Sequence, residues 1–284
     1  MEFTECHFLD TGYCLTPEFA VLQGGRWRIT RCRCLAALMR HPTEGWGLWD
    51  TGYAPRFLDA TRRLPYRLYR WATPFPRQAD RSVVSQLAEK ELTTADIQWI
   101  VLSHLHGDHI AGVRDFPSAR LICTREAFDH ASRLKGIVAV RKAFVPALLP
   151  TDFESRSLFI DRFDGPCLGA LGRSFDLFGD GSALLFPLPG HARGQMGMLA
   201  KTAAGTKLMA ADSAMHRVSI REGRPPGSLT RLIADQPDQV LPTIQNLRAF
   251  TRDHPEIRVY PTHCPEAYRE VIEEGSALCL PITV

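Results

Sequence analysis

The chain has 284 residues, of which 45% are hydrophobic and 23% charged, a composition typical of a folded globular protein and not of a disordered one. Its formal net charge of +3 does not by itself indicate nucleic-acid binding, and the sequence has no run of about 18 apolar residues that would cross a membrane. The N-terminal segment carries acidic residues and no basic region, so we expect no signal peptide and a cytoplasmic protein.

The eight cysteines are scattered, and without an export signal we expect reduced thiols, many of them buried. Cys32 and Cys34 alternate, so on a strand they would share one face. A two-cysteine zinc or redox site is one interpretation, but no second ligand pair has the required spacing, which favours two small core residues. The full set is Cys6, Cys14, Cys32, Cys34, Cys123, Cys167, Cys264 and Cys279.

Strands separated by turns are predicted in the first half of the chain. Residues 26–39 alternate polar and apolar side chains, as in a half-buried strand, and a turn at Gly45–Gly47 leads through Leu48 and Trp49 to Asp50-Thr51-Gly52. Residues 83–92 fit a short helix, with Thr93 or Thr94 capping a further turn. The apolar run 99–103 indicates a buried strand that ends directly in a polar cluster beginning at His104.

The second half repeats this arrangement. Strands are predicted at 184–188, 207–211 and 257–260, and a helix at 238–250. The three strands end in turn at His191, Asp212 and His263. Because α/β folds assemble their sites at strand ends, these polar residues are candidates for one shared site.

Two stretches, 55–81 and 131–175, fit this pattern less well, and we interpret them as decorations on a single domain that spans 1–284. The first holds seven arginines and interleaved aromatic residues. A solvated surface is the favoured interpretation, and the alternatives are a subunit contact in a homodimer or a docking site for an acidic substrate or a membrane surface. The same composition would also suit phosphate or stacked bases.

The sequence His104-Leu105-His106-Gly107-Asp108-His109 places four potential metal ligands in six residues. Imidazole and carboxylate groups suit zinc, and also iron or manganese, and burying such a loop without metal would be costly. Four ligands from so short a loop could not all reach one ion, so we expect two metal ions. His191 and His263 could complete one site each, and the carboxylate of Asp212 could bridge them.

This motif, with the upstream D-T-G and the downstream G-H, D and H at strand ends, resembles the metallo-β-lactamase superfamily over residues 48 to 264. The resemblance implies an α/β (α+β) four-layer αβ/βα sandwich, with two mixed sheets and helices outside. It implies that His104, His106 and His191 hold one metal ion and that Asp108, His109 and His263 hold the other. Asp212 would bridge the two ions, and Asp50 would orient a ligand imidazole.

Differences between this sequence and particular branches of the superfamily indicate which branch it resembles most. His106 stands where the flavodiiron branch has Glu, and only fifty residues separate Asp212 from His263, too few for the inserted domain of the RNA-cleaving members. The N-terminal Gly12-Tyr13-Cys14 and the ending His263-Cys264-Pro265-Glu266 resemble the N-acyl-homoserine lactonases. Those enzymes commonly carry a Tyr three residues after the bridging Asp, where this chain has Met215, followed by His216.

The expected activity is therefore a dinuclear-metal hydrolase, with two zinc ions, that opens a lactone or similar ester through a bridging hydroxide. Asp108 and Asp212 are its candidate catalytic residues, with Asp108 relaying a proton. A glyoxalase II-type thioesterase, a phosphodiesterase or nuclease, and a non-catalytic metal-binding member are the alternatives. Apolar residues of 131–150, together with Tyr13, Phe19, Met215 and His216, could line a pocket for the acyl chain. For each apolar residue among them, core packing is the favoured interpretation. The low-ranked pocket candidates are Tyr13, Phe19, Phe144, Met215 and His216.

Overall fold

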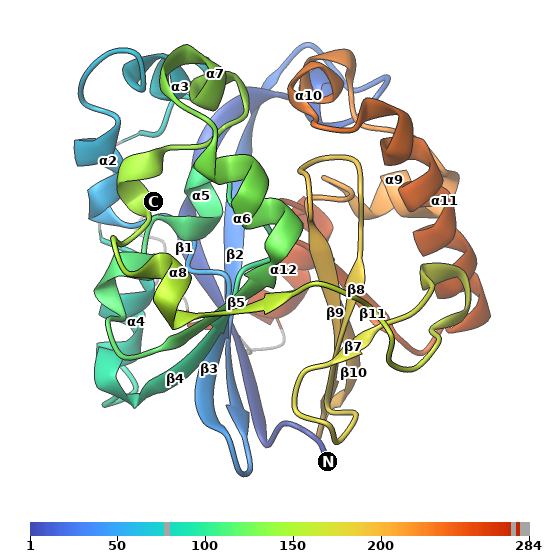
Figure 1. The fold of residues 1–284 in the computed structure, drawn as a ribbon. Helices are drawn as coiled ribbons and strands as arrows, with labels where there is room; N and C mark the ends of the chain where they lie inside the picture. The colour runs from blue at the N-terminus through green and yellow to red at the C-terminus, as the bar shows by residue number, and fades with distance from the viewer. Residues whose placement is uncertain (77–79, 274–276, 279–284) are drawn as a thin grey trace.

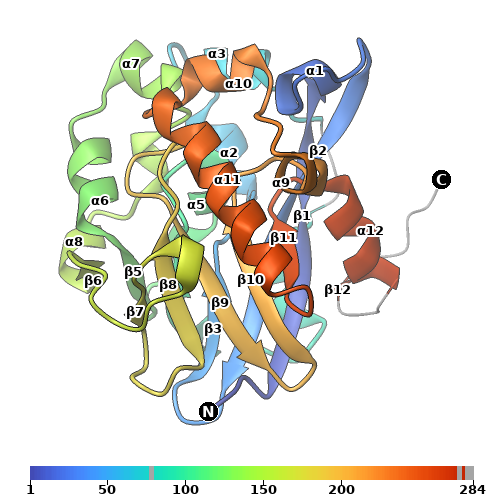
Figure 2. The same cartoon turned by 90° about the vertical axis from the view of Figure 1, so that its right-hand side faces the viewer.

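The computed structural model describes residues 1–76, 80–273 and 277–278, and Cys279 and Arg77 lie outside them. It contains two mixed sheets that face each other, with helices on the outer side of each (Figures 1 and 2). The larger sheet has the order β12 (Ala277–Leu278), β1 (Glu5–Pro17), β2 (Ile29–His41), β3 (Gly45–Trp49), β4 (Ile97–Val101), β5 (Arg120–Thr124) and β6 (Ser157–Ile160). The smaller sheet has the order β11 (Arg258–Pro261), β10 (Gly205–Ala211), β9 (Met196–Thr202), β8 (Ala183–Pro187) and β7 (Phe175–Asp176).

Helices form the two outer layers, and the short α1 (Glu18–Val21) follows β1. The larger sheet is covered by α2 (Pro55–Ala60), α3 (Arg67–Ala72), α4 (Val83–Ala88), α5 (Gly107–Ile110), α6 (Arg125–Ser132), α7 (Gly136–Arg141) and α8 (Phe153–Arg156) (Figure 1). The C-terminal part supplies α9 (Arg217–Glu222), α10 (Ser228–Ile233), α11 (Pro237–Asp253) and α12 (Pro265–Glu273). Short 3-10 turns lie at Thr94–Asp96, Val113–Asp115, Pro146–Leu148 and Gly169–Leu171. No helix of the described residues is both long and apolar enough to cross a bilayer.

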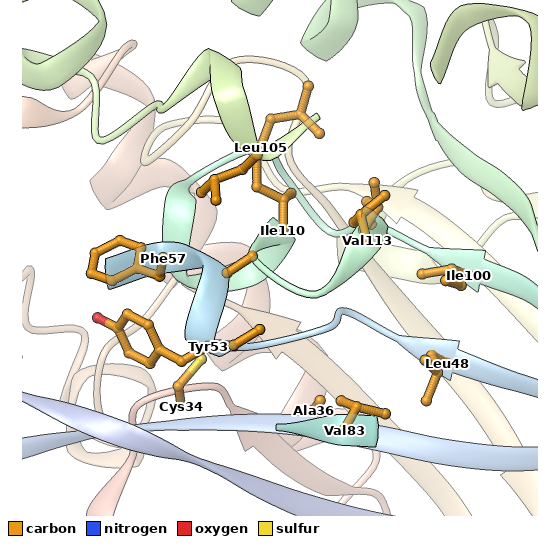
Figure 3. Close-up of a cluster of buried hydrophobic side chains, with 14 of the residues drawn as sticks. Cys34, Ala36, Leu48, Tyr53, Phe57, Val83, Ile100, Leu105, Ile110 and Val113 are labelled. Carbon is orange, nitrogen blue, oxygen red and sulfur yellow. The ribbon is translucent and has the colours of Figure 1, made fainter. Parts of the chain in front are cut away.

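The strand β2 shows why the layers stack in this way. Its even-numbered side chains, from Cys32 to Leu38, lie in the core between the larger sheet and its helices. Figure 3 shows two of them, Cys34 and Ala36. Its odd-numbered side chains, from Leu35 to Met39, lie in the core between the two sheets. A strand buried on both faces must sit in an inner layer, so the predicted half-buried strand is buried more fully than its alternation indicated. A third core lies between the smaller sheet and α9 and α11. The predicted four-layer fold is confirmed.

Local predictions differ from the structure at a few boundaries. The turn expected at Gly45–Gly47 lies at 42–44, and both glycines belong to β3. Gly47 is needed because a Cβ there would come within 2.0 Å of the Trp99 ring. The helix expected over 83–92 ends at Ala88, and Thr93 caps the next turn together with Asp96.

The stretches 55–81 and 131–175 contribute to the core, which the sequence did not indicate. Phe57 and Tyr69 from the first and Leu148 and Phe153 from the second are buried against the larger sheet. Residues 157–160 form β6, which pairs in parallel with β5. The apolar side chains of these stretches are spread among charged residues, so periodicity alone did not reveal a buried face.

The topology brings the predicted polar clusters to one place. In the smaller sheet β8 is antiparallel to β9 and β9 to β10, while β10 and β11 are parallel, so β8, β10 and β11 run in one direction. Their carboxyl ends therefore share an edge, and β4 in the other sheet leads into the same region. The segments that follow these four strands carry the predicted ligands.

Candidate metal centre

The motif residues follow β4 as an extended segment that turns into α5. His106 is the N-cap of α5, and Asp108 and His109 lie in its first turn. This turn divides the motif: His104 and His106 point into one cluster, and Asp108 and His109 into another. The division matches the expectation that the four ligands cannot serve one ion.

The first cluster joins His104 and His106 with His191, which follows β8, and Asp212, which follows β10. All four side chains are buried. His191 Nε2 lies 3.0 Å from His106 Nδ1 and 3.4 Å from Asp212 Oδ2, and His104 Nε2 lies 3.9 Å from the same oxygen. The donor atoms of the cluster lie within 4.8 Å of one another.

The second cluster consists of Asp108, His109 and His263, which follows β11. His263 Nε2 lies 3.4 Å from Asp108 Oδ2. Asp212 lies between the clusters, because its Oδ1 is 3.4 Å from His109 Nε2 and its Oδ2 is 3.0 Å from His263 Nε2. The structure thus brings together all seven predicted ligands, with Asp212 in contact with both groups.

Two observations indicate that these residues fit a metal centre. Two donors at about 2.1 Å from one tetrahedral zinc ion lie about 3.4 Å apart, which is close to the spacings between these atoms. In addition, His104 Nε2, His109 Nε2 and Asp212 Oδ1 are buried without a hydrogen-bond partner among the described residues. Unpaired buried polar atoms are costly, and the presence of such atoms in both clusters indicates that cations are missing there.

The two clusters differ in the direction in which the pKa values of their histidines are shifted. Burial, reinforced by neighbouring imidazoles, lowers the pKa of His104, and it lowers the pKa of His106 to about 3. These rings are neutral near pH 7, as metal binding requires. Burial also opposes the charged form of His263, but Asp212 outweighs it and raises the pKa of His263 to about 9. Burial opposes the charged form of His109 as well. The carboxylates of Asp212 and Asp50 outweigh this effect, and the pKa of His109 rises well above its usual range.

Asp50, the predicted orienting residue, lies directly behind this centre. Its side chain is buried, and Oδ2 accepts a hydrogen bond from His109 Nδ1 at 2.8 Å. Ser103 donates to both Asp50 oxygens, through its backbone N–H and its hydroxyl, at 2.7 Å each. The Ser103 hydroxyl also lies 3.0 Å from His104 Nδ1. Asp50 and Ser103 therefore fix ring orientations in both clusters.

Tyr69 on α3 is a site residue that sequence reasoning missed. Its buried hydroxyl donates to Asp108 Oδ1 at 3.1 Å, which leaves Oδ2 facing His263. Gly107 makes room for this ring: a Cβ there would lie 3.0 Å from Tyr69 and 3.3 Å from Phe57. Gly107 begins α5 without a positive φ, so close packing, and not backbone freedom, is the reason for a glycine at this position. No local signal links residues 69 and 108.

A backbone carbonyl and a thiol of β2 also form hydrogen bonds with residues of the second cluster. The carbonyl of Arg33 accepts a hydrogen bond from His263 Nδ1, and Cys34 Sγ donates to the Asp108 carbonyl at 3.0 Å. Cys32 and Cys34 are buried as free thiols on one face of β2, as the core interpretation expected.

The candidate pocket residues are dispersed. Phe144 is buried in the core of the larger sheet, and Met215, three residues after Asp212, is also buried. His216 is the N-cap of α9, where its Nδ1 accepts from the Val218 N–H. Phe19 packs against Trp27, and Tyr13 lies under the guanidinium groups of Arg31 and Arg33. The structure therefore buries Phe144 and Met215, while Tyr13 lies in β1, Phe19 in α1 and His216 at the start of α9.

The sequence profile described as the metallo-beta-lactamase superfamily matches residues 29–263, so the chain belongs to this superfamily. The predicted resemblance is confirmed, including its lactonase branch. The chain is 26% identical over 195 residues to "N-acyl homoserine lactonase AttM" of Agrobacterium fabrum, a match that covers 66% of each chain. The chain thus spans just under two thirds of the length of this curated relative.

Two solved structures share the fold. One is the B. thuringiensis protein AiiA, in a variant with N-decanoyl-L-homoserine bound at the active site; it is 17% identical, covers 95% of this chain and 97% of its own, and has a TM-score of 0.72. The other is AidC, described as a dizinc quorum-quenching lactonase; it is 14% identical, covers 93% and 90%, and has a TM-score of 0.62.

Proposed function

We propose that the chain is a metal-dependent hydrolase that opens a lactone or a similar carboxylic ester. The observation that carries the proposal is the convergence of seven buried donor residues with three unpaired polar atoms at one edge of the two sheets. The similarity to a lactonase over 195 residues supports the choice of a cyclic ester as substrate.

The first metal ion would be held by His104, His106 and His191 and the second by Asp108, His109 and His263, with Asp212 between them. Imidazole nitrogen and carboxylate oxygen suit zinc, and iron or manganese would accept the same donors. The similarity to a dizinc lactonase supports zinc. When bound, the pair would supply a hydroxide nucleophile near neutral pH and polarise the carbonyl of the substrate.

The chain's own residues prepare this chemistry. Asp50 and Ser103 hold the His109 ring so that its Nε2 faces Asp212. The Tyr69 hydroxyl occupies Asp108 Oδ1 and directs Oδ2 toward His263. Asp108 is therefore the candidate proton carrier: its fixed carboxylate could accept the proton that the attacking hydroxide gives up and pass it to the departing alkoxide, which in a lactone stays tethered to the acyl product.

A lactone panel with the Asp212→Ala variant tests the proposal. We expect metal-dependent lactone opening by the wild type and a loss of at least about 100-fold in kcat/KM in the variant, because it removes the carboxylate shared by both clusters. Asp180→Ala is the matched control, since Asp180 is a hydrogen-bonded carboxylate outside both clusters, beside His41. Turnover of bis-p-nitrophenyl phosphate or a glutathione thioester in place of lactones would contradict the lactone assignment.

A further inference from the structure

Four segments gather at one end of the molecule, and we call them the rim. They are the loop 26–29 between β1 and β2, residues 62–71 around α3, residues 135–142 around α7, and residues 228–233 in α10. Both views place α3, α7 and α10 together at this end, with α1 and the tip of β1 and β2 beside them (Figures 1 and 2). The N-terminus lies at the opposite end.

The rim lies next to the metal centre, because one of its segments, and the residues directly after two others, bond to the segments that carry ligands. In α3, Tyr69 donates to Asp108. Directly after α7, the carbonyl of Ala143 accepts from the Gly107 N–H inside the motif. Directly after α10, the Asp235 N–H donates to the carbonyl of His191. The outer surface of the rim therefore lies over the clusters.

Exposed apolar side chains are concentrated in the rim. Of the eleven exposed large hydrophobic residues among those the structure describes, nine belong to it. The most exposed are Trp27 at 89%, Leu232 at 74% and Leu64 at 65%, and Trp71 is 58% exposed. Single exposed apolar residues need no explanation, but nine around one site form a patch of the kind that marks an interaction surface.

The charged side chains of the same segments are all basic. Ten of the 34 Lys and Arg residues lie in the rim and none of the 31 Asp and Glu residues does, so the rest of the chain has an excess of acid. Two of these cations have acidic partners outside the rim: Arg28 pairs with Glu18 and Lys142 with Asp235. Among the described ion pairs, Arg62, Arg63 and Arg67 have none. The Arg67 guanidinium lies 5.1 Å over the Trp71 ring, which places a cation and an aromatic group at one exposed spot.

We propose that the rim docks on an anionic lipid bilayer surface. Apolar and aromatic side chains interleaved with Lys and Arg are the composition of interfacial membrane-binding elements, in which apolar groups insert and cations meet lipid phosphates. A second copy of the chain fits less well, because a two-fold contact through this face would oppose two basic surfaces. The metal centre would then open toward the bilayer. The docking itself does not depend on the proposed reaction.

Vesicle co-sedimentation of the intact chain tests the proposal. We expect binding to vesicles of phosphatidylcholine with phosphatidylglycerol, at least about tenfold weaker binding to phosphatidylcholine alone, and a blue shift of tryptophan emission from Trp27 and Trp71 on binding. Binding to the anionic vesicles should fall at least about tenfold in 0.5 M salt, because screening shortens the reach of the charges.

Two double variants separate the contributions of the rim. Arg63→Glu with Arg67→Glu should weaken anionic-vesicle binding at least about tenfold, and Trp71→Ser with Leu232→Ser should weaken it and reduce the emission shift. The matched control is Lys201→Glu with Arg252→Glu, which makes the same charge change on exposed residues at the end of β9 and α11; it should bind within about twofold of wild type. Thermal melts and metal content check that each variant folds.

Three results would overturn the proposal. The first is a wild-type chain that does not bind anionic vesicles. The second is equal weakening by the rim variants and by the control. The third is concentration-dependent self-association, without vesicle binding, that the rim substitutions abolish. Vesicle binding is measured without substrate, so a failure of the lactonase assignment gives a separate result.

Discussion

The substitution Asp50→Asn tests most closely how Asp50 holds the His109 ring of the second cluster in place. The carboxylate accepts three hydrogen bonds, two from Ser103 and one from His109 Nδ1. Asparagine keeps the size of the side chain, and it tolerates the positive φ of 57° at this position. Its amide, however, has only one accepting oxygen, so in either orientation an N–H faces a donor.

The magnitude follows from the lost bond. A hydrogen bond to a charged group contributes about 1.5–3 kcal/mol, which equals roughly a 10- to 100-fold change in an equilibrium constant. Because the His109 ring is held by this bond, we expect zinc affinity at the second cluster to fall by about 10- to 100-fold. Affinity at the first cluster should change by no more than about threefold, since only His104 touches Ser103 there.

The assay is a competition titration of the metal-free protein with a zinc chelator that resolves the two binding steps. Asp10→Asn is the matched control, because Asp10 is a fully buried carboxylate paired with Arg33 and Arg81 and belongs to neither cluster. The control should lose stability and keep both affinities. Unchanged affinities in Asp50→Asn, an equal loss at both clusters, or the same loss in the control would refute the reasoning.

Three further substitutions test other contacts. Tyr69→Phe removes the hydrogen bond to Asp108 Oδ1 and keeps the ring, so we expect about a fivefold to tenfold weaker second zinc step in the same titration, and a thermal stability within about 1 kcal/mol of wild type. Gly107→Ala places a Cβ 3.0 Å from Tyr69, and overpacking should cost about 1–3 kcal/mol in denaturant unfolding. Asp180→Asn tests a pH-linked contact: burial opposes the charge, but Ser182 and His41 lower the pKa of Asp180 to about 2. The carboxylate therefore stabilises the fold above about pH 4, by about 1 kcal/mol for a group that is partly exposed, and this difference should shrink below about pH 4 and be lost as pH falls through about 2.

Each of these has an outcome that would contradict it. An unchanged second zinc step in Tyr69→Phe would mean that the hydroxyl does not orient Asp108. Wild-type stability of Gly107→Ala would mean that the Tyr69 and Phe57 rings move aside freely. A stability difference for Asp180→Asn that is as large at about pH 2 as at about pH 5 would show that the contribution of Asp180 is not electrostatic.

The metal motif and most strands near it could be predicted from local signals in the sequence, and the layered fold followed from the superfamily resemblance of that motif. Four ligands within His104–His109 cannot be explained by packing, and short apolar runs that end in polar residues mark the strands that carry them. Asp212 and His263 carry weak local signals: their place at predicted strand ends made them candidates, and the superfamily resemblance strengthened that prediction. The structure places both beside the motif, at the ends of β10 and β11.

Contacts between distant segments could not be predicted. Tyr69 reaches Asp108 only because α3 packs over α5, and the need for Gly107 follows from that packing. Phe144 was a low-ranked pocket candidate for which core packing was favoured, and its burial in the core became visible only with its neighbours in place. The concentration of exposed apolar and basic residues at one end likewise appears only once four separate segments are assembled.

Zinc stoichiometry of the metal-free chain tests the central claim most directly. Isothermal titration with elemental analysis of wild type and Asp212→Ala would count the ions that the two clusters hold. The account predicts two ions per wild-type chain, and loss of at least one tight site in the variant, because Asp212 contacts donors of both clusters. A wild-type chain that binds fewer than one ion after reconstitution, or a variant that still binds two ions tightly, would contradict it.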